Sequence, residues 1–245
     1  MLVDELHTYL FDSQPHLLAE PMATWLSSSR RFAAFVETFH NKIRKKIRTT
    51  QGTENLLDLQ LELETAYWLL QERILHIDYE PVPLRQGRAP DFAVRYTTSL
   101  TFMVEVTRLR TEPGDALPTE PGSPNERLID SICRKLRQLR PQQSNVVVVG
   151  MENPLPTDDA LPATLSTIQQ RAEQADADFL RRHHLRNRAD FFRHYVQLSE
   201  IILRGQTTAE TTSALFWVNP QAKHPLPSKV RTALHRAAAS STSEP

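Results

Sequence analysis

The chain has 245 residues, with 29 Lys and Arg against 29 Asp and Glu, 40% hydrophobic residues, 6 glycines and 1 cysteine. This length is enough for one large buried core, and the zero formal charge excludes a protein that attracts polyanions over its whole surface. A lone Cys133 excludes an internal disulfide or a multi-cysteine zinc site, and the scattered glycines exclude a phosphate-binding or dinucleotide-binding loop. Asp4 and Glu5 stand where a secretory signal needs basic residues, and no stretch is apolar enough to span a membrane. We therefore expect a cytoplasmic protein without a membrane partner.

Residues 1–50 are predicted to form an N-terminal helical extension. Pro15 and Pro21 predict breaks between short helices, and the serines at 27–29 offer N-caps for a helix over Arg30–Arg48. Apolar residues recur along that helix at helical spacing and give it one face that should pack on another element. Its end, 42–48, carries five positive charges in seven residues. These charges either complement the helix dipole in solvent or contact a phosphate backbone.

Residues 51–236 are predicted to form one α/β domain. We expect a helix, three strands, a second helix and a further strand, in that order, at Thr53–Leu75, Ile77–Leu84, Asp91–Tyr96, Thr101–Leu109, Asn125–Arg140 and Asn145–Val149. The second and third strands read as a hairpin, and the uninterrupted β-branched run Val146–Val149 is typical of a strand covered on both faces. The element order predicts a three-layer α/β fold around a mixed sheet.

The remainder of the chain is predicted to extend this domain. The proline- and glycine-containing segment Thr111–Pro124 reads as a long surface loop, and a polar, partly helical stretch runs to Tyr195. Leu198–Leu203 and Leu215–Val218 read as two more strands, and residues 237–245 as a flexible tail. The stretch around His183 and His184 is rich in arginine and reads either as solvated helix surface or as a patch that faces nucleic acid.

Three acidic residues are unusual in their local context. Glu62 lies at the rim of the apolar stripe of its helix, whereas Glu64 is about 200° further round and should face water. Asp91 follows Pro90, which favours an extended entry into a strand. Glu105 sits in a strand that is otherwise almost entirely apolar, so its charge should be paired or metal-bound. Strand alternation places Glu105 and Thr107 on one face.

These residues resemble the PD-(D/E)XK nuclease superfamily, which has the restriction-endonuclease-like fold. The matching features are Pro90-Asp91, thirteen intervening residues, and Glu105-Val106-Thr107, preceded by a helix that carries Glu62. The resemblance covers about Thr53 to Gly150 and implies an αβββαβ core. It also implies a divalent cation, Mg²⁺ or alternatively Mn²⁺, held by Asp91 and Glu105 with Glu62 in support.

The sequence departs from the superfamily pattern at one position. The motif lysine, which orients the attacking water and offsets phosphate charge, is replaced by Thr107. Lys135 lies at the margin of the apolar stripe of the next helix and is a candidate for the missing amine, because a lysine there can snorkel into a cleft. Gln138, one turn on, resembles the polar helix residue that some exonuclease-like members place near the site.

The sequence thus predicts a metal-dependent nuclease that hydrolyses phosphodiester bonds, in DNA rather than RNA, and leaves a homodimer open. Two other readings remain: a catalytically degenerate nuclease-fold protein that binds nucleic acid or a protein partner, and an α/β interaction protein whose carboxylates only form salt bridges. Each residue also has an ordinary explanation. Asp91 could be a turn residue, Glu105 could pair with Arg95, Thr107 could be a plain strand former, Lys135 could lie on the helix surface, and Glu62 could cap or pair locally.

Overall fold

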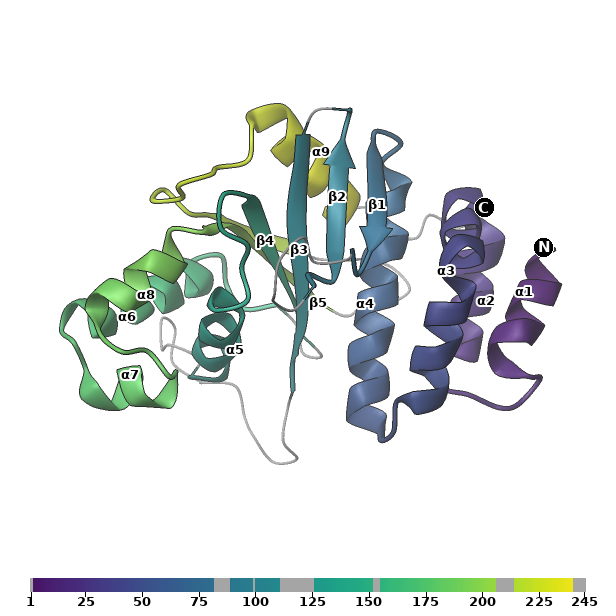
Figure 1. The fold of residues 1–245 in the computed structure, drawn as a ribbon, viewed down its shortest axis with the longest axis horizontal. Helices are drawn as coiled ribbons and strands as arrows, with labels where there is room; N and C mark the ends of the chain where they lie inside the picture. Colours follow the sequence, from purple (N-terminus) through teal and green to yellow (C-terminus); the bar gives the residue numbers. More distant parts are fainter. Residues whose placement is uncertain are drawn as a thin grey trace.

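A computed structural model describes residues 2–81, 89–98, 100–110, 126–151, 155–205 and 214–239 of the chain. The predicted loop Thr111–Pro124, residues 82–84 of the first predicted strand and residues 240–245 of the predicted tail lie outside these ranges. The described chain begins with four consecutive helices, continues with three consecutive strands, and ends with further helices and strands interspersed (Figure 1). In order they are α1 (Val3–Phe11), α2 (Ala19–Ser28), α3 (Arg30–Thr49), α4 (Thr53–Gln71), β1 (Leu75–Tyr79), β2 (Phe92–Tyr96), β3 (Leu100–Leu109), α5 (Glu126–Leu136), β4 (Ser144–Met151), α6 (Ala160–Glu173), α7 (Ala177–Arg182), α8 (Arg188–Tyr195), β5 (Leu198–Gly205), β6 (Ala214–Val218) and α9 (Ser228–Ala239).

The strands of the described chain form one six-stranded mixed sheet in the order β1-β2-β3-β4-β5-β6. β1, β2 and β3 are antiparallel neighbours, β3, β4 and β5 run parallel, and β6 returns antiparallel at the other edge. The predicted mixed sheet and the hairpin of β2 and β3 are therefore confirmed. β2 begins at Phe92, which pairs with Val104, so β3 continues past the end of its neighbour. This step in the sheet positions the candidate site.

Each face of the sheet is covered by its own hydrophobic core. Alternate residues of β4 supply the two cores, because Val146 and Val148 pack on the side of α4 and α9, whereas Val147 and Val149 pack on the side of α5, α6 and α8. All four of these valines are fully buried, as predicted for a strand with helices on both faces. β3 has the same alternation, with Val104 and Val106 facing α4 and Leu109 facing α5.

The N-terminal helices pack into the first of these cores. Trp25 of α2 stacks on Tyr67 of α4 at a ring separation of 5.8 Å, and Phe32 of α3 meets the same ring edge-on. Ser29 caps α3 by accepting a hydrogen bond from the Phe32 amide, as predicted. Pro21 does not break a helix but lies in the first turn of α2, where a missing N–H costs nothing, so that part of the prediction is wrong.

The central helix α4 is buried around most of its circumference. Its buried residues fall on consecutive positions from Leu61 to Leu70, apart from Glu62 and Glu64, because β1 and β3, α3 and α9 all pack on it. Glu64 was expected to face water, and this is wrong: its carboxylate lies 3.3 Å from Arg204 of β5, whose side chain is almost fully buried. Helical periodicity fails here because the helix has more than one apolar face.

The C-terminal helix α9 was not expected. Residues 237–239 belong to it rather than to a flexible tail, and Ala237 and Ala238 are buried against the α4 side of the sheet. Arg204 fixes the end of α9 by donating a hydrogen bond to the carbonyl of Ala238 at 2.7 Å. Within the described residues, no helix combines the length and apolar character needed to cross a bilayer.

Candidate active site: an acid–lysine cluster at the end of β2

Asp91 lies at the step where β2 begins and β3 continues. It follows Pro90, and its backbone carbonyl accepts a hydrogen bond from Glu80, which extends the β1–β2 pairing by one residue. Its side-chain Oδ2 accepts a hydrogen bond from the Val106 amide at 2.7 Å. The carboxylate therefore takes the place of a strand partner for β3, which fixes its position more firmly than a turn would.

Glu105 projects from the middle of β3 towards α5, on the same face as Thr107 and Leu109. Its side chain is only 3% exposed, and its Oε2 lies 2.8 Å from the Nζ of Lys135. Arg95 is not positioned for the alternative pairing, because it stands opposite Thr101, four residues before Glu105. The buried charge is thus paired, as its apolar surroundings require.

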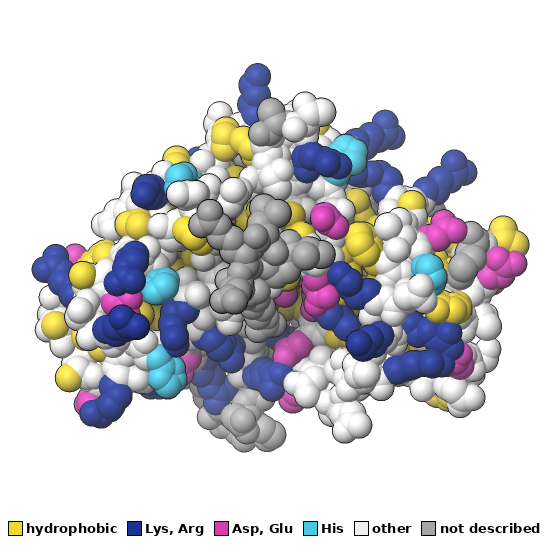
Figure 2. All heavy atoms as spheres, in the orientation of Figure 1, with side chains coloured by type: hydrophobic (Ala, Val, Ile, Leu, Met, Phe, Trp, Pro, Cys, Tyr) yellow, Lys and Arg dark blue, Asp and Glu magenta, His cyan; other side chains and the backbone are white. Residues whose placement is uncertain are grey.

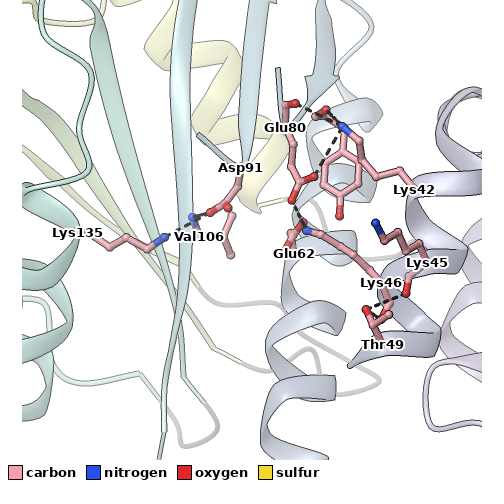
Figure 3. Close-up of polar contacts among 10 residues, drawn as sticks. Lys42, Lys45, Lys46, Thr49, Glu62, Glu80, Asp91, Val106 and Lys135 are labelled. Carbon is pink, nitrogen blue, oxygen red and sulfur yellow. Dashed lines mark hydrogen bonds and ion pairs between the residues drawn. The ribbon is translucent and has the colours of Figure 1, made fainter. Parts of the chain in front are cut away.

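Lys135 of α5 joins the two carboxylates. Its Nζ lies 2.8 Å from Glu105 and 3.4 Å from Asp91 Oδ2, and its side chain is 7% exposed. The lysine predicted to reach in from the margin of the helix therefore does so (Figure 3). Two carboxylates against one ammonium leave this buried cluster with a formal charge of −1, so it can still attract a cation.

Glu62 belongs to a neighbouring cluster that approaches Asp91 from the α4 side. Lys46 of α3 donates to Glu62 Oε1 at 2.6 Å and to Glu80 at 2.7 Å, and the Lys46 ammonium also lies 4.8 Å from the ring centre of Tyr79. In Figure 3, Asp91 lies between Lys135 on one side and Glu62 with Lys46 on the other. Thus, part of the basic end of α3 forms ion pairs within the protein and is not a fully solvated turn.

The electrostatics of this second cluster follow from burial. Burial raises the pKa of Glu62, and although Lys46 opposes that shift, the nearby charge of Asp91 reinforces it. Burial alone would lower the pKa of Lys46, but attraction to Glu62 and Glu80 outweighs burial and raises it. The pKa of the buried Tyr79 hydroxyl is also raised by burial. Glu62 therefore senses the charge of Asp91, which makes the two clusters electrostatic neighbours.

The donor set can be compared with the needs of a divalent cation. Mg²⁺ is usually held by one or two carboxylates together with water and substrate phosphate, and Asp91 and Glu105 match that requirement in number and chemistry. No group of three or more Asp, Glu, His or Cys residues in the described part of the chain is arranged to hold a metal ion. Glu62 thus does not join Asp91 and Glu105 as a third ligand in this arrangement, and its carboxylate is paired with Lys46 instead.

Two other predicted residues lie near the cluster on the α5 side. Thr107 stands two residues beyond Glu105 on the same face, and its Oγ1 lies 3.4 Å from the guanidinium of Arg134. Gln138 follows α5, and its Oε1 is buried with no hydrogen-bond partner among the residues that the structure describes. An unsatisfied buried amide oxygen is costly, so this atom is suited to a partner that arrives from outside.

A basic groove lies beside the cluster, and sequence reasoning noticed only one side of it, the arginine-rich stretch around His183 and His184. It encloses about 720 Å³ along α5, between the end of β3 and the end of α7. Figure 2 shows Arg and His side chains gathered over this part of the molecule. The groove is lined by Arg108, Leu109, Arg110, Arg127, Asp130, Ser131, Arg134, Arg137, Gln138, Arg182, His183 and His184. The signal that could have found the other side is the recurrence of Arg127 and Arg134 on one face of α5, with Arg137 directly after the helix.

Comparisons of the chain with protein-family models, curated protein sequences and solved structures gave no match.

Proposed function

We propose that this protein is a metal-dependent nuclease that hydrolyses phosphodiester bonds, with DNA preferred over RNA. The observation that carries the proposal is the position of Lys135, whose ammonium lies within hydrogen-bond distance of both Glu105 and Asp91. A helix-borne lysine thereby supplies the positive group that Thr107 cannot. The order α4, β1, β2, β3, α5, β4 supports the proposal because it matches the helix, three strands, helix and strand of the restriction-endonuclease-like core.

The chain's own residues have distinct parts in this proposal. Asp91 and Glu105 would hold Mg²⁺ or Mn²⁺, and the Val106 amide fixes the Asp91 carboxylate for that task. A bound cation would supply an activated water near neutral pH and offset charge on the phosphate. The Lys135 ammonium adds positive charge beside the reacting phosphate, and Thr107 offers a hydroxyl on the same face. Glu62 on the α4 side and Gln138 on the α5 side support the cluster of Asp91, Glu105 and Lys135. Glu62 acts through its charge, and Gln138 offers its buried amide oxygen.

The test is cleavage of supercoiled plasmid, single-stranded DNA and RNA by the full chain with Mg²⁺ or Mn²⁺. Asp91→Asn and Glu105→Gln keep the shape of each side chain and should abolish cleavage. Asp78→Asn, which changes an exposed carboxylate on β1, is the matched control and should keep it. Lys135→Met should lose most of the activity and Lys135→Arg should retain part of it. Cleavage that survives both Asp91→Asn and Glu105→Gln would refute this site.

A second candidate function follows from the burial of the same cluster. Asp91, Glu105 and Lys135 are each less than a tenth exposed and are already paired with one another, as in a structural ion-pair network. This favours a catalytically degenerate relative that binds nucleic acid or a protein partner. Metal binding by the wild-type chain, measured by calorimetry and lost in Glu105→Gln, would support this candidate if all three substrates remain uncleaved and the affinity for nucleic acid falls as salt rises.

A further inference from the structure

We infer that the basic groove along α5 binds the phosphate backbone of double-stranded nucleic acid. Of the twelve described residues that line the groove, six are arginines, against one acidic residue, Asp130. The chain as a whole has no net charge, so this local excess of positive charge is not a consequence of composition. The inference rests on the proposed function in so far as it identifies the form of the substrate.

The arginines of the groove fall into two groups. Arg108 and Arg110 are held by carboxylates of α4, and Arg182 pairs with Asp130, so these three guanidinium groups are partly neutralised. In the described part of the chain, Arg134 and Arg137 form no ion pair, and both are exposed. Two exposed guanidinium groups without a carboxylate are therefore available to a ligand that brings its own negative charge.

The geometry of α5 suits a polymer with regularly spaced negative charges. Arg127 and Arg134 are seven residues apart on one face of the helix, which corresponds to about 10 Å along its axis. One DNA strand advances about 3.4 Å per phosphate along the duplex axis, so this length of helix faces about three phosphates. Arg134 also contacts Thr107, two residues from Glu105, so the groove begins beside the carboxylates of the candidate active site.

The lack of aromatic side chains among the described lining residues favours binding of a nucleic-acid duplex over binding of a single strand. Sites for single-stranded nucleic acid stack bases on aromatic side chains, and none of the lining residues that the structure describes is Phe, Tyr or Trp. Of the two histidines, His183 is buried against Phe179. Burial lowers the pKa of His183, which leaves its ring neutral near pH 7. The lining thus favours phosphate contacts, which a duplex presents on its outside, over base stacking.

The test is binding of a fluorescent 20-base-pair DNA to the full chain, measured by anisotropy in EDTA over a series of salt concentrations, so that cleavage is not needed. Arg134→Ala/Arg137→Ala should weaken binding at 0.1 M salt by about tenfold for each of the two guanidinium groups removed from a phosphate. It should also reduce the slope of log affinity against log salt by roughly two. The matched control, Arg181→Ala/Arg193→Ala, removes the same charge from exposed arginines outside the groove and should bind as the wild type does.

Three results with nucleic acid would overturn the inference: no duplex binding by the wild type, an equal decrease in affinity in the two double variants, or tighter binding of a single strand of the same length. A poly-glutamate peptide that binds more tightly than the duplex, through Arg134 and Arg137, would overturn it in favour of an acidic protein partner. Because the assay contains no metal, duplex binding without any cleavage elsewhere would support the groove and refute the nuclease. Cleavage by a chain that does not bind duplex through the groove would support the nuclease and refute the groove.

Discussion

Lys135 determines the charge balance of the cluster at the end of β2. Its ammonium contacts both Asp91 and Glu105, and all three side chains are buried. Removing one partner of a buried ion pair leaves the other charge without compensation. The same ammonium that would act on a phosphate therefore also keeps the two carboxylates compatible with the core.

We expect Lys135→Met to destabilise the fold. The substitution keeps the bulk of the side chain but leaves two buried carboxylates facing each other, which should cost about 3–5 kcal/mol of unfolding free energy. The double variant Lys135→Met/Glu105→Gln should recover part of this stability because one of the two charges is gone. Urea unfolding at neutral pH provides the measurement, and Lys45→Met, an exposed lysine of α3, is the control and should unfold like the wild type.

Addition of Mg²⁺ extends this experiment to the proposed metal site without any assay of activity. If Asp91 and Glu105 bind the ion, Mg²⁺ should stabilise Lys135→Met by mass action and should not stabilise Lys135→Met/Glu105→Gln to the same extent. An equal response of the two variants to Mg²⁺ would argue against these ligands. Wild-type stability in Lys135→Met would contradict the charge argument itself.

Glu62 should make stability fall as pH rises. Burial raises its pKa above the ordinary value of 4.5, so the folded chain holds this proton more tightly than the unfolded chain does. The stabilising effect of the protonated form is complete below the ordinary value and is lost as pH rises towards the folded-state pKa. The difference in unfolding free energy between the wild type and Glu62→Gln, which does not titrate here, should therefore decrease across that interval and then level off.

Urea unfolding of both proteins at a series of pH values from 4 to 8, a range that is roughly where acidic groups with raised pKa values titrate, measures this difference. A difference that increases with pH would mean that Lys46 outweighs burial and that the pKa of Glu62 is lowered. In that case the coupling to Asp91 would lose its support.

The positions of the candidate site residues could be predicted only where the local sequence pattern determines them. Glu105 and Thr107 share a face because strand alternation requires it, and Lys135 could be placed from the edge of its helical stripe. The pairing of Glu62 with Lys46 could not be predicted. The two residues are sixteen positions apart in the chain, and their contact depends on how α3 packs on α4. The residue pattern alone therefore gave no reason to remove Glu62 from the proposed metal site.

At the scale of whole elements, prediction succeeded for strands and failed for two kinds of helix. The uninterrupted valines of β4 and the hairpin of β2 and β3 carry strong local signals. α9 has a weak one, because much of its buried face consists of small residues, such as Ala233 and Ala237, and the polar tail follows it directly. For α4 the helix itself was predicted but the orientation of its side chains was not, because a helix packed on several sides has no single polar face that marks the solvent side.

The contact between α4 and β4 gives a prediction at this scale. A Cβ added to Gly150 of β4 would lie 2.5 and 2.7 Å from the two Cδ atoms of Leu61, which is closer than real contacts allow. Leu61 is buried, so Gly150→Ala forces a shift in packing and should destabilise the chain by roughly 1–3 kcal/mol. Leu61→Ala should cost less in the Gly150→Ala background than in the wild type, because it opens the space that the new methyl group needs.

A double-mutant cycle of these two substitutions, followed by urea unfolding, measures the coupling. Additive costs would mean that Leu61 and residue 150 do not compete for the same space, and that the close approach of α4 to the sheet is not maintained by Gly150.

At the scale of the whole molecule, charge is balanced in total but unevenly distributed. The groove along α5 concentrates arginines, whereas the basic end of α3 is largely paired, with Asp12 on Arg44 and Arg48 and with Glu62 and Glu80 on Lys46. The groove, which includes part of the arginine-rich stretch around His183 and His184, therefore differs in role from the basic end of α3. A polyanion should be attracted to the groove rather than to α3, and that attraction should weaken as salt is added.

The two hydrophobic cores should unfold together, although the N-terminal helices resemble an appendage in the sequence. The buried apolar residues of β4 and of its parallel neighbours are divided between the two cores, so neither core can open without disturbing strands that the other core needs. The three tryptophans allow this to be measured, since Trp25 reports α2 stacked on α4 and Trp217 reports β6 beside Tyr195 of α8. Trp68→Phe/Trp217→Phe and Trp25→Phe/Trp68→Phe each leave one of these reporters. Within each variant, the tryptophan fluorescence transition in urea should coincide with the loss of helical circular dichroism. An earlier transition at Trp25 than in the circular dichroism would show that α1–α3 unfold as a separate unit.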